Sequence, residues 1–226
     1  MPWSNFPYDW DSWEHDPSVR TSVALHTQWA PVDVTLTTPG TAQDLFNITP
    51  NIPTVNIATN PSFETGAPPT GYTAAGATLA QSATVARNGT NSLRITPNNA
   101  AAGEGAFWTS ADQLASGINS QQLYWVVSAY FNDNAGSGNG ARIVIADTAG
   151  TTIVNGNTVT LAAAWNRSTA ALLLTGRTAA QYRVYFVTAT QFPTVFYVDS
   201  FQSELLLGQG TATDYVDGSL GVNQEW

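Results

Sequence analysis

The residue with the sharpest chemical requirement is Asp199, which stands in the aromatic and β-branched run 195–204 near the C-terminus. A carboxylate between large aromatic side chains is costly to bury alone. We therefore expect Asp199 to have backbone donors, an arginine or a metal ion beside it. With a period of two residues, the run predicts a strand that places Phe196, Val198, Ser200, Gln202 and Glu204 on one face and Tyr197, Asp199, Phe201, Ser203 and Leu205 on the other.

Catalytic chemistry has little support in residues 53–217. This region contains no cysteine, no histidine, no Gly-x-Ser-x-Gly motif and no glycine loop that would hold a phosphate. A glycosidase would need two carboxylates flanking a cleft. The acids Glu104, Asp112, Asp133 and Asp147 fall in expected loops or strand ends. We therefore predict that the chain is not an enzyme.

Short β-strands are the elements that must position these side chains. Glycine, proline, threonine, serine and asparagine are abundant and charged residues make up only 10% of the chain, which favours strands and turns over helices. The predicted fold class is all-β: a two-sheet antiparallel jelly-roll sandwich with an extended N-terminal arm. We expect 195–204 to close the sandwich beside 54–64. The other predicted strands are 77–86, 91–96, 121–131, 142–146, 158–161, 165–174 and 182–187.

The net charge of −9 is unevenly distributed, with acidic ends and a nearly neutral middle. All basic residues are arginines, and they form no dense patch that could replace the counterions of a nucleic acid, so we expect no nucleic-acid binding. The absence of cysteine excludes disulfides. No apolar stretch approaches the roughly 18 residues that span a bilayer, so we expect no membrane insertion. Residues 1–6 do not have the pattern of an ordinary signal peptide.

Residues 1–52 are predicted to form an extended aromatic and acidic arm, with a short strand at 32–38 before the turn signal Pro39-Gly40. Such a segment builds no core of its own, yet it carries residue types that dominate interface energies. We expect the arm either to dock on another subunit or protein, or to fold back onto its own domain. The arm residues expected to bind a partner are Trp3, Phe6, Tyr8, Trp10 and Trp13.

A family resemblance emerges from short motifs in a fixed order. Asn60-Pro-Ser-Phe-Glu64, Pro69-Thr-Gly-Tyr72, Gly89-Thr-Asn-Ser-Leu93 and 196–204 resemble the β-jelly-roll carbohydrate-binding modules, in the versions found in structural and tail proteins of tailed bacteriophages. The resemblance covers roughly residues 54–217. It implies a jelly roll at 53–217 followed by a C-terminal tail at 218–226. Tyr72 stands where such modules more often have tryptophan.

The resemblance also implies two kinds of site. Such modules often hold a structural calcium ion near their terminal strands, which here points to Glu64 and Asp199. The alternative is that these acids pair with Arg87 or Arg94 or accept backbone hydrogen bonds. A glycan site would use aromatic platforms and polar groups on strands. The candidates for this glycan site are Tyr124, Tyr130, Arg183 and Tyr185, with Trp108 and Trp165 in addition.

The functional expectation is a non-enzymatic virion structural protein of a bacteriophage, either a capsid decoration or a tail component. It would assemble in the host cytoplasm, contact other virion proteins through its arm and form oligomers. The alternatives are a module that binds a host-surface polysaccharide, or the non-catalytic part of a polysaccharide-degrading enzyme.

Overall fold

The computed structural model describes residues 56–110, 122–178, 180–208 and 210–216, together with the backbone of two strands at 22–27 and 30–35. The chain divides into two compact units, Met1–Ile52 and Pro53–Trp226. Within the first unit, β1 (Ser22–Thr27) and β2 (Ala30–Thr35) form an antiparallel hairpin. The strand predicted at 32–38 therefore begins earlier, at Ala30. Its partner β1 was not predicted from the sequence.

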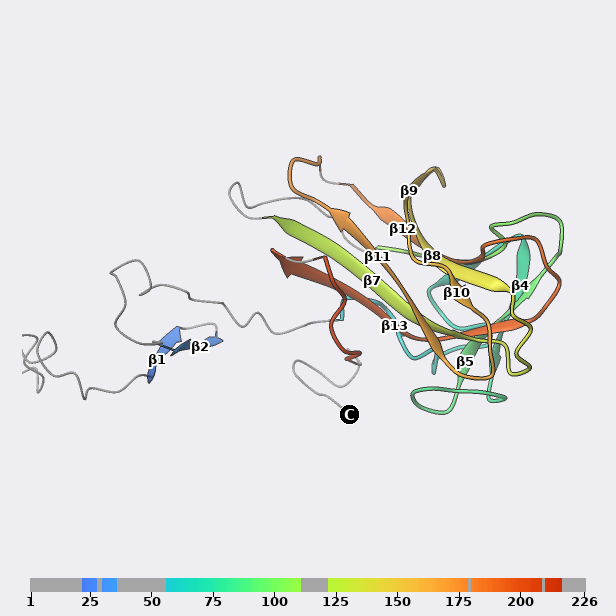
Figure 1. Cartoon of the computed structure of the whole chain (residues 1–226), viewed down its shortest axis with the longest axis horizontal. Coiled ribbons are helices and arrows are strands. Elements are labelled where there is room, and N and C mark those ends of the chain that lie inside the picture. Colours follow the sequence, from blue (N-terminus) through green and yellow to red (C-terminus); the bar gives the residue numbers. More distant parts are fainter. Residues whose placement is uncertain are drawn as a thin grey trace, which may run out of the picture. The chain divides into compact units, whose positions relative to one another are not determined.

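The second unit is a sandwich of two antiparallel sheets, which confirms the predicted fold class (Figure 1). The five-stranded sheet has the order β11-β7-β13-β5-β4. The six-stranded sheet has the order β10-β8-β12-β6-β3, with β9 paired to β8. The strands of the five-stranded sheet are β4 (Ala77–Ser82), β5 (Ser92–Pro97), β7 (Leu123–Asn132), β11 (Asn166–Leu173) and β13 (Phe196–Leu207). Those of the six-stranded sheet are β3 (Tyr72–Ala75), β6 (Gly105–Thr109), β8 (Gly140–Asp147), β9 (Thr152–Asn155), β10 (Val159–Thr160) and β12 (Tyr182–Thr188).

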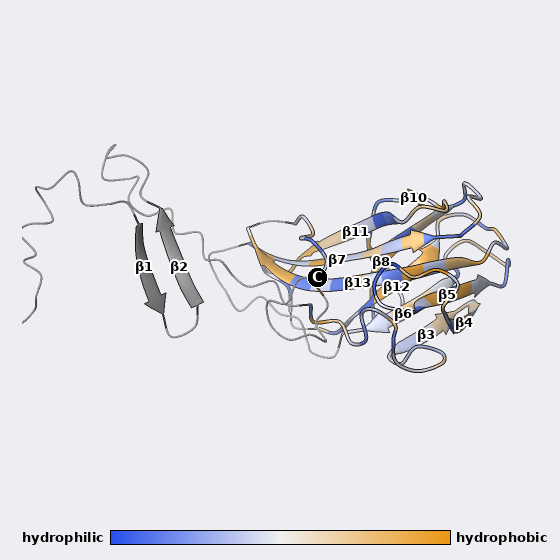
Figure 2. Ribbon diagram, turned by 90° about the horizontal axis from the view of Figure 1, so that it is seen from below, coloured by the Kyte–Doolittle hydropathy of each residue, from blue (hydrophilic) through white to orange (hydrophobic). Residues whose placement is uncertain are grey.

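No helix occurs among the residues that the structure describes, so none there is long and apolar enough to cross a membrane. The strands change between hydrophobic and hydrophilic residues along their length, as Figure 2 shows, because one face of each sheet packs on the core.

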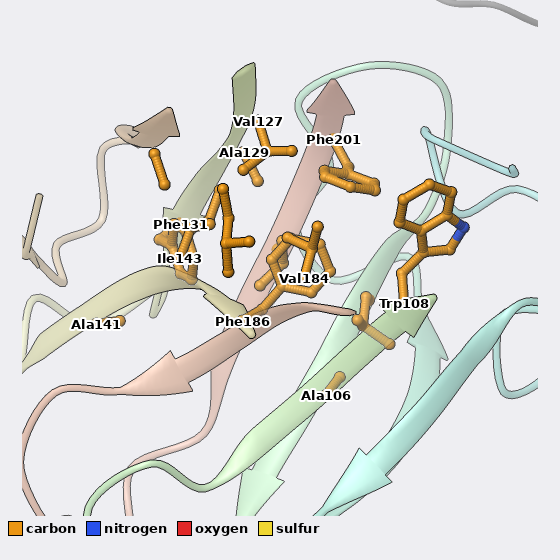
Figure 3. Packing of buried hydrophobic residues seen from close by; sticks show 14 of the residues in the cluster. Ala106, Trp108, Val127, Ala129, Phe131, Ala141, Ile143, Val184, Phe186 and Phe201 are labelled. Atoms are coloured by element: carbon orange, nitrogen blue, oxygen red, sulfur yellow. The ribbon is translucent and has the colours of Figure 1, made fainter. Parts of the chain in front are cut away.

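Aromatic side chains fill the space between the sheets (Figure 3). Phe186 of β12 packs edge-on against Phe201 of β13, with ring centroids 4.9 Å apart, and Trp108 of β6 lies 5.4 Å from Phe201. On β7, the alternate residues Trp125, Val127, Ala129 and Phe131 are fully buried in this core. Burial of this much apolar surface is the main force that holds the two sheets together.

The strand β13 departs from simple alternation at its centre. Its register with β7 shifts between Asp199 and Gln202, where Ser200 has a φ of 53°. One extra residue in a strand reverses which side chains face inward beyond it. The prediction that Val198 and Phe201 lie on opposite faces was therefore wrong, because both pack in the core.

The segment before Glu64 lies beside β13 but forms no strand in its described part, residues 56–64. The ladder partners of β13 are β5 and β7 instead. The segment is held by separate hydrogen bonds: the amide of Ile57 donates to the carbonyl of Ser203, and the amide of Phe201 donates to the carbonyl of Pro61. The predicted neighbourhood is correct, but the predicted strand pairing is not.

Candidate functional site

The four predicted glycan residues fall on opposite sides of the sandwich. Tyr124 and Tyr130 lie on β7, at positions that alternate with the core residues of the five-stranded sheet. Arg183 and Tyr185 lie on β12, at positions that alternate with the core residues of the six-stranded sheet. Because the core separates the two outer faces, these residues cannot form one site. Of the two additional candidates, Trp108 is a core residue and Trp165 is half-buried.

The outer face of the five-stranded sheet is covered by the chain's own segment 210–216. The Thr213 amide and hydroxyl donate to the carboxylate of Glu204 at 2.9 and 2.7 Å. The side chain of Gln202 donates to the Thr213 hydroxyl and accepts from the Val216 amide. Arg167 on β11 donates to the Thr213 carbonyl and, at 2.8 Å, to the Ser128 hydroxyl. This network fastens the segment across β13, β7 and β11.

Both tyrosines on this face already have partners. The guanidinium of Arg87 lies 3.6 Å from the centre of the Tyr130 ring, and that of Arg167 lies 5.5 Å from it. A Cβ atom added to Gly210 would stand 3.2 Å from the Tyr124 ring, so the backbone passes close to it. A sugar stacks on an aromatic face that is open to solvent. The arrangement therefore disfavours Tyr124 and Tyr130 as a glycan platform.

Asp199 has backbone donors beside it, which is one of the arrangements predicted from the sequence. Although it alternates with core residues, its side chain is fully buried beneath the loop 83–91. One carboxylate oxygen accepts from the amides of Arg87 and Asn88 at 2.5 and 3.0 Å, and the other accepts from the amide of Ser200 at 2.6 Å. Burial, together with the smaller effect of the Glu64 charge, raises the pKa of Asp199 to about 7 against these hydrogen bonds.

Glu64 is held by the C-terminal end of the same loop. Its carboxylate accepts from the amides of Thr90 and Asn91, both at 2.8 Å, and from their side chains. Partial burial raises the pKa of Glu64, but the hydrogen bonds from Thr90 and Asn91 outweigh it and lower this pKa below its usual value. The two acids thus fasten the middle and the C-terminal end of one loop.

These surroundings do not fit a calcium ion shared by Glu64 and Asp199. Calcium takes six to eight oxygen ligands. The oxygens of both carboxylates instead face N–H and O–H donors, which point positive hydrogens at the place a cation would occupy. Among the described residues no group of three or more acidic or histidine side chains forms a metal cluster.

The remaining described acids of the sandwich also bind loop backbone. Glu104 accepts from the amides of residues 99–101, Asp133 from those of residues 135–137, and Asp147 from those of Ala149 and Thr151. Each carboxylate between 56 and 208 that the structure describes thus closes a loop or turn. A general acid or base needs a carboxylate that faces a substrate, and this set supplies none.

The outer face of the six-stranded sheet presents an aromatic pair instead. Phe107 on β6 and Tyr185 on β12 are register partners, and their ring centroids are 5.1 Å apart with an interplanar angle of 37°. Both side chains are half-buried. The guanidinium of Arg183 lies 4.6 Å from the centre of the Phe107 ring. Arg183 covers the Phe107 ring as Arg87 covers that of Tyr130, so Tyr185 is the ring of this pair on which the apolar face of a sugar can lie.

Neighbouring residues complete this face. Val144 on β8 pairs with Tyr185 in register, and Thr73 on β3 pairs with Phe107, so one row crosses β3, β6, β12 and β8. Arg142 on β8 stands opposite Val187, on the far side of this row from Arg183. A Cβ atom on Gly150 would lie 3.3 Å from the Tyr185 hydroxyl, which places the turn fastened by Asp147 beside the aromatic pair. We define the sheet-6 face by Phe107, Arg142, Arg183 and Tyr185.

Sequence reasoning found half of the sheet-6 face. Arg183 and Tyr185 were predicted, whereas Phe107 and Arg142 were missed. The alternation in Gly105–Thr109, with Ala106 and Trp108 inward and Phe107 outward, was the available signal for Phe107. The predicted arm residues Trp3, Phe6, Tyr8, Trp10 and Trp13 lie outside the described residues.

Comparison with known proteins places the sandwich among known folds. No family model matches the chain, and no curated protein matches it. The chain is similar to the CBM22-1 xylan-binding domain from Paenibacillus barcinonensis, with a TM-score of 0.50 and 21% identity over 67% of this chain and 93% of that one. The domain therefore has a fold like that of carbohydrate-binding modules.

Proteins with other activities share this fold. A Stig cyclase from Fischerella sp. TAU, in complex with an indole compound, has a TM-score of 0.55 and 14% identity over 69% of this chain and 100% of that one. An arabinose-bound α-L-arabinofuranosidase has a TM-score of 0.51 and 14% identity over 68% of this chain and 26% of that one. At these identities the likeness shows the fold alone.

Proposed function

We propose that the sandwich is a non-enzymatic glycan-binding module whose binding surface is the sheet-6 face. The observation that carries this proposal is the outward pair of Phe107 and Tyr185 with Arg183 stacked beside it. The other sheet offers no equivalent, because segment 210–216 and Arg87 lie over its tyrosines. The engagement of the described carboxylates between 56 and 208 by backbone amides supports binding without catalysis.

The proposal is tested with a glycan array, followed by calorimetric titration of the best ligand against wild type and Y185A. Loss of one aromatic stacking partner should weaken binding about tenfold, since such contacts contribute on the order of 1–2 kcal/mol. Y124A is the matched control, because it removes the same ring from the other sheet and should leave affinity unchanged. Equal weakening by both variants, or an array with no ligand, contradicts the proposal.

A second candidate function concerns the first unit of the chain. Residues 1–50 hold six acids against the single basic residue Arg20, together with several tryptophans, and this unit ends at Ile52. We propose that it attaches the module to other virion proteins of a bacteriophage particle, so that the sandwich is displayed to a host-surface polysaccharide. Burial of several aromatic side chains at an interface would offset the entropy lost when the segment becomes ordered.

The experiment is deletion of residues 1–30, followed by measurement of how much protein enters purified particles. Incorporation should fall to background, while the free module keeps its glycan binding. Unchanged incorporation would remove the first unit from the attachment mechanism without affecting the glycan proposal.

A further inference from the structure

The two arginines of the sheet-6 face lack a carboxylate partner. Neither Arg142 nor Arg183 forms an ion pair with a described residue, and the Nε atom of each is buried without a hydrogen-bond partner. The Nε atom of Arg167 is also buried without a partner, but Arg167, like Arg87 and Arg177, donates other hydrogen bonds to oxygens of the chain itself. A guanidinium whose donors are unused is prepared to bind an anion from outside.

Arg183 is also held in a fixed orientation. Its guanidinium stacks on the Phe107 ring at 4.6 Å, and its strand neighbours Val184 and Tyr182 are buried in the core. A planar guanidinium that is already ordered loses little conformational entropy when it binds a carboxylate through two parallel hydrogen bonds. The stack therefore favours a planar anionic group over a bare hydroxyl.

The local charge of this face is positive, although the chain carries −9 overall. The outward positions of its strands hold the residues Thr73, Ala75, Gly105, Phe107, Thr109, Arg142, Val144, Ala146, Arg183, Tyr185 and Val187. None of these is acidic. The two acids next to these positions in sequence, Glu104 and Asp147, both accept hydrogen bonds from loop amides. A negatively charged ligand would meet no acidic side chain at these outward positions.

The spacing of the two arginines suits a polymer. In the register of β8 and β12, Arg183 stands opposite Ala146 and Arg142 stands opposite Val187, so the two are four positions apart. At about 3.3 Å per residue this separation is roughly 13 Å, with the Phe107–Tyr185 row between them. A chain of sugars that carries repeated carboxylates can contact both arginines while it lies across the aromatic pair.

We propose that the sheet-6 face selects acidic polysaccharides, in which uronic acid carboxylates bind Arg142 and Arg183 while a sugar ring lies against Tyr185. This inference rests on the proposed glycan-binding function and specifies its ligand class. It commits to a carboxylated glycan, because two guanidinium groups and no carboxylate border the stacking surface.

The test compares a polyuronate with the same polymer after chemical reduction of its carboxyl groups to alcohols. Calorimetric titration at low salt should show the polyuronate binding at least tenfold more tightly than the reduced polymer. R183Q and R142Q should each weaken polyuronate binding about tenfold, in line with one lost charge-assisted contact. R183K keeps the charge but not the planar fork, so its loss should be intermediate.

R94Q is the matched control. Arg94 lies on β5 of the five-stranded sheet, so this variant removes the same charge from the opposite side of the sandwich. It should bind the polyuronate as wild type does. Thermal unfolding of each variant establishes that its fold is intact, and R142Q tests the inference independently if R183Q fails to fold.

The outcomes separate the two proposals. Equal affinity for the polyuronate and its reduced form overturns the selectivity for acidic glycans but leaves glycan binding in place. Equal weakening by R94Q and R183Q shows attraction to the whole molecule and also overturns the selectivity. Absence of binding to either polymer, and to the neutral glycans of the array, overturns the glycan-binding function itself.

Discussion

Asp199 should make the stability of the sandwich fall as the pH rises through neutrality. Burial raises its pKa from 3.8 to about 7, so the folded protein retains a proton that the unfolded chain releases. The stabilisation by protonated Asp199 is therefore fully present below pH 3.8 and is lost as the pH rises through about 7. At about 1.4 kcal/mol per pKa unit, the free energy of unfolding should decrease by about 3 kcal/mol between pH 4.5 and 7.5.

The other acids act in a different range. The pKa values of Glu64, Glu104, Asp133 and Asp147 are lowered by backbone and side-chain hydrogen bonds. Their contribution is present above their unfolded pKa values, 4.5 for the glutamates and 3.8 for the aspartates, and is lost as the pH falls through the lowered folded values. Most of the window from pH 4.5 to 7.5 lies above this range, so Asp199 dominates the slope there.

The assay is urea unfolding at a series of pH values and constant ionic strength. D199N cannot titrate, so its unfolding free energy should stay level across the window. The unfolding free energy of D199N should be lower than that of wild type by about 1–3 kcal/mol. The side-chain NH2 group of the new asparagine would face a buried backbone N–H that donates to Asp199 in wild type. E64Q removes a charge that raises the pKa of Asp199, so the unfolding free energy should still fall with pH, but the fall should end at a lower pH than in wild type. A wild-type unfolding free energy that is constant or rises from pH 4.5 to 7.5 would show that folding does not raise the pKa of Asp199.

Two further variants test the packing around β13 and β12. N56A should lower the unfolding free energy by roughly 3–4 kcal/mol in urea titration, because the buried Asn56 side chain bonds the backbone of Phe201, Val216, Ala58 and Ser203. The exposed N155A should change it by less than about 0.5 kcal/mol, and a similar loss in both would contradict this role. G105A should lower the melting temperature far more than G103A, since a Cβ at 105 would stand 1.8 Å from the Phe186 carbonyl oxygen, whereas one at 103 meets nothing within 4 Å and adds only the backbone strain of a φ of +87°. Comparable losses would show that β6 and β12 are not packed as described.

The fold class was predictable because alternation is a local signal. The inward set of β7, from Leu123 to Phe131, follows directly from a period of two residues, and the turns at Ala149-Gly150 and Asn155-Gly156 border strands as their chemistry requires. Two short strands were not predicted from the sequence. Tyr72–Ala75 and Thr152–Asn155 are only four residues long, which is too short for alternation to stand out.

The site was only half predictable because it depends on which sheet each strand joins. Alternation assigns Tyr130 and Tyr185 to the outward side of their own strands, but it does not say that these sides face opposite directions. That information lies in the strand order, with β7 between β11 and β13 and β12 between β8 and β6. The covering of Tyr124 by Gly210 depends equally on long-range contacts.

The register shift in β13 was likewise not predictable from the local sequence. Ser200 carries a positive φ that no local motif announces, and the conformation is supported by hydrogen bonds to Asp199 and Asn88. The requirement that Asp199 be paired was read correctly from chemistry. The identity of its donors, the amides of Arg87 and Asn88 from a distant loop, came only from the three-dimensional structure.

The most direct measurement is a map of backbone amide chemical shifts by NMR during titration with the best glycan from the array. The account predicts that the shifting amides gather on β6, β8 and β12 around Phe107, Arg142, Arg183 and Tyr185, while those of β7 and β11 stay in place. Shifts centred on β7 and segment 210–216, with β6 and β12 unchanged, would contradict it.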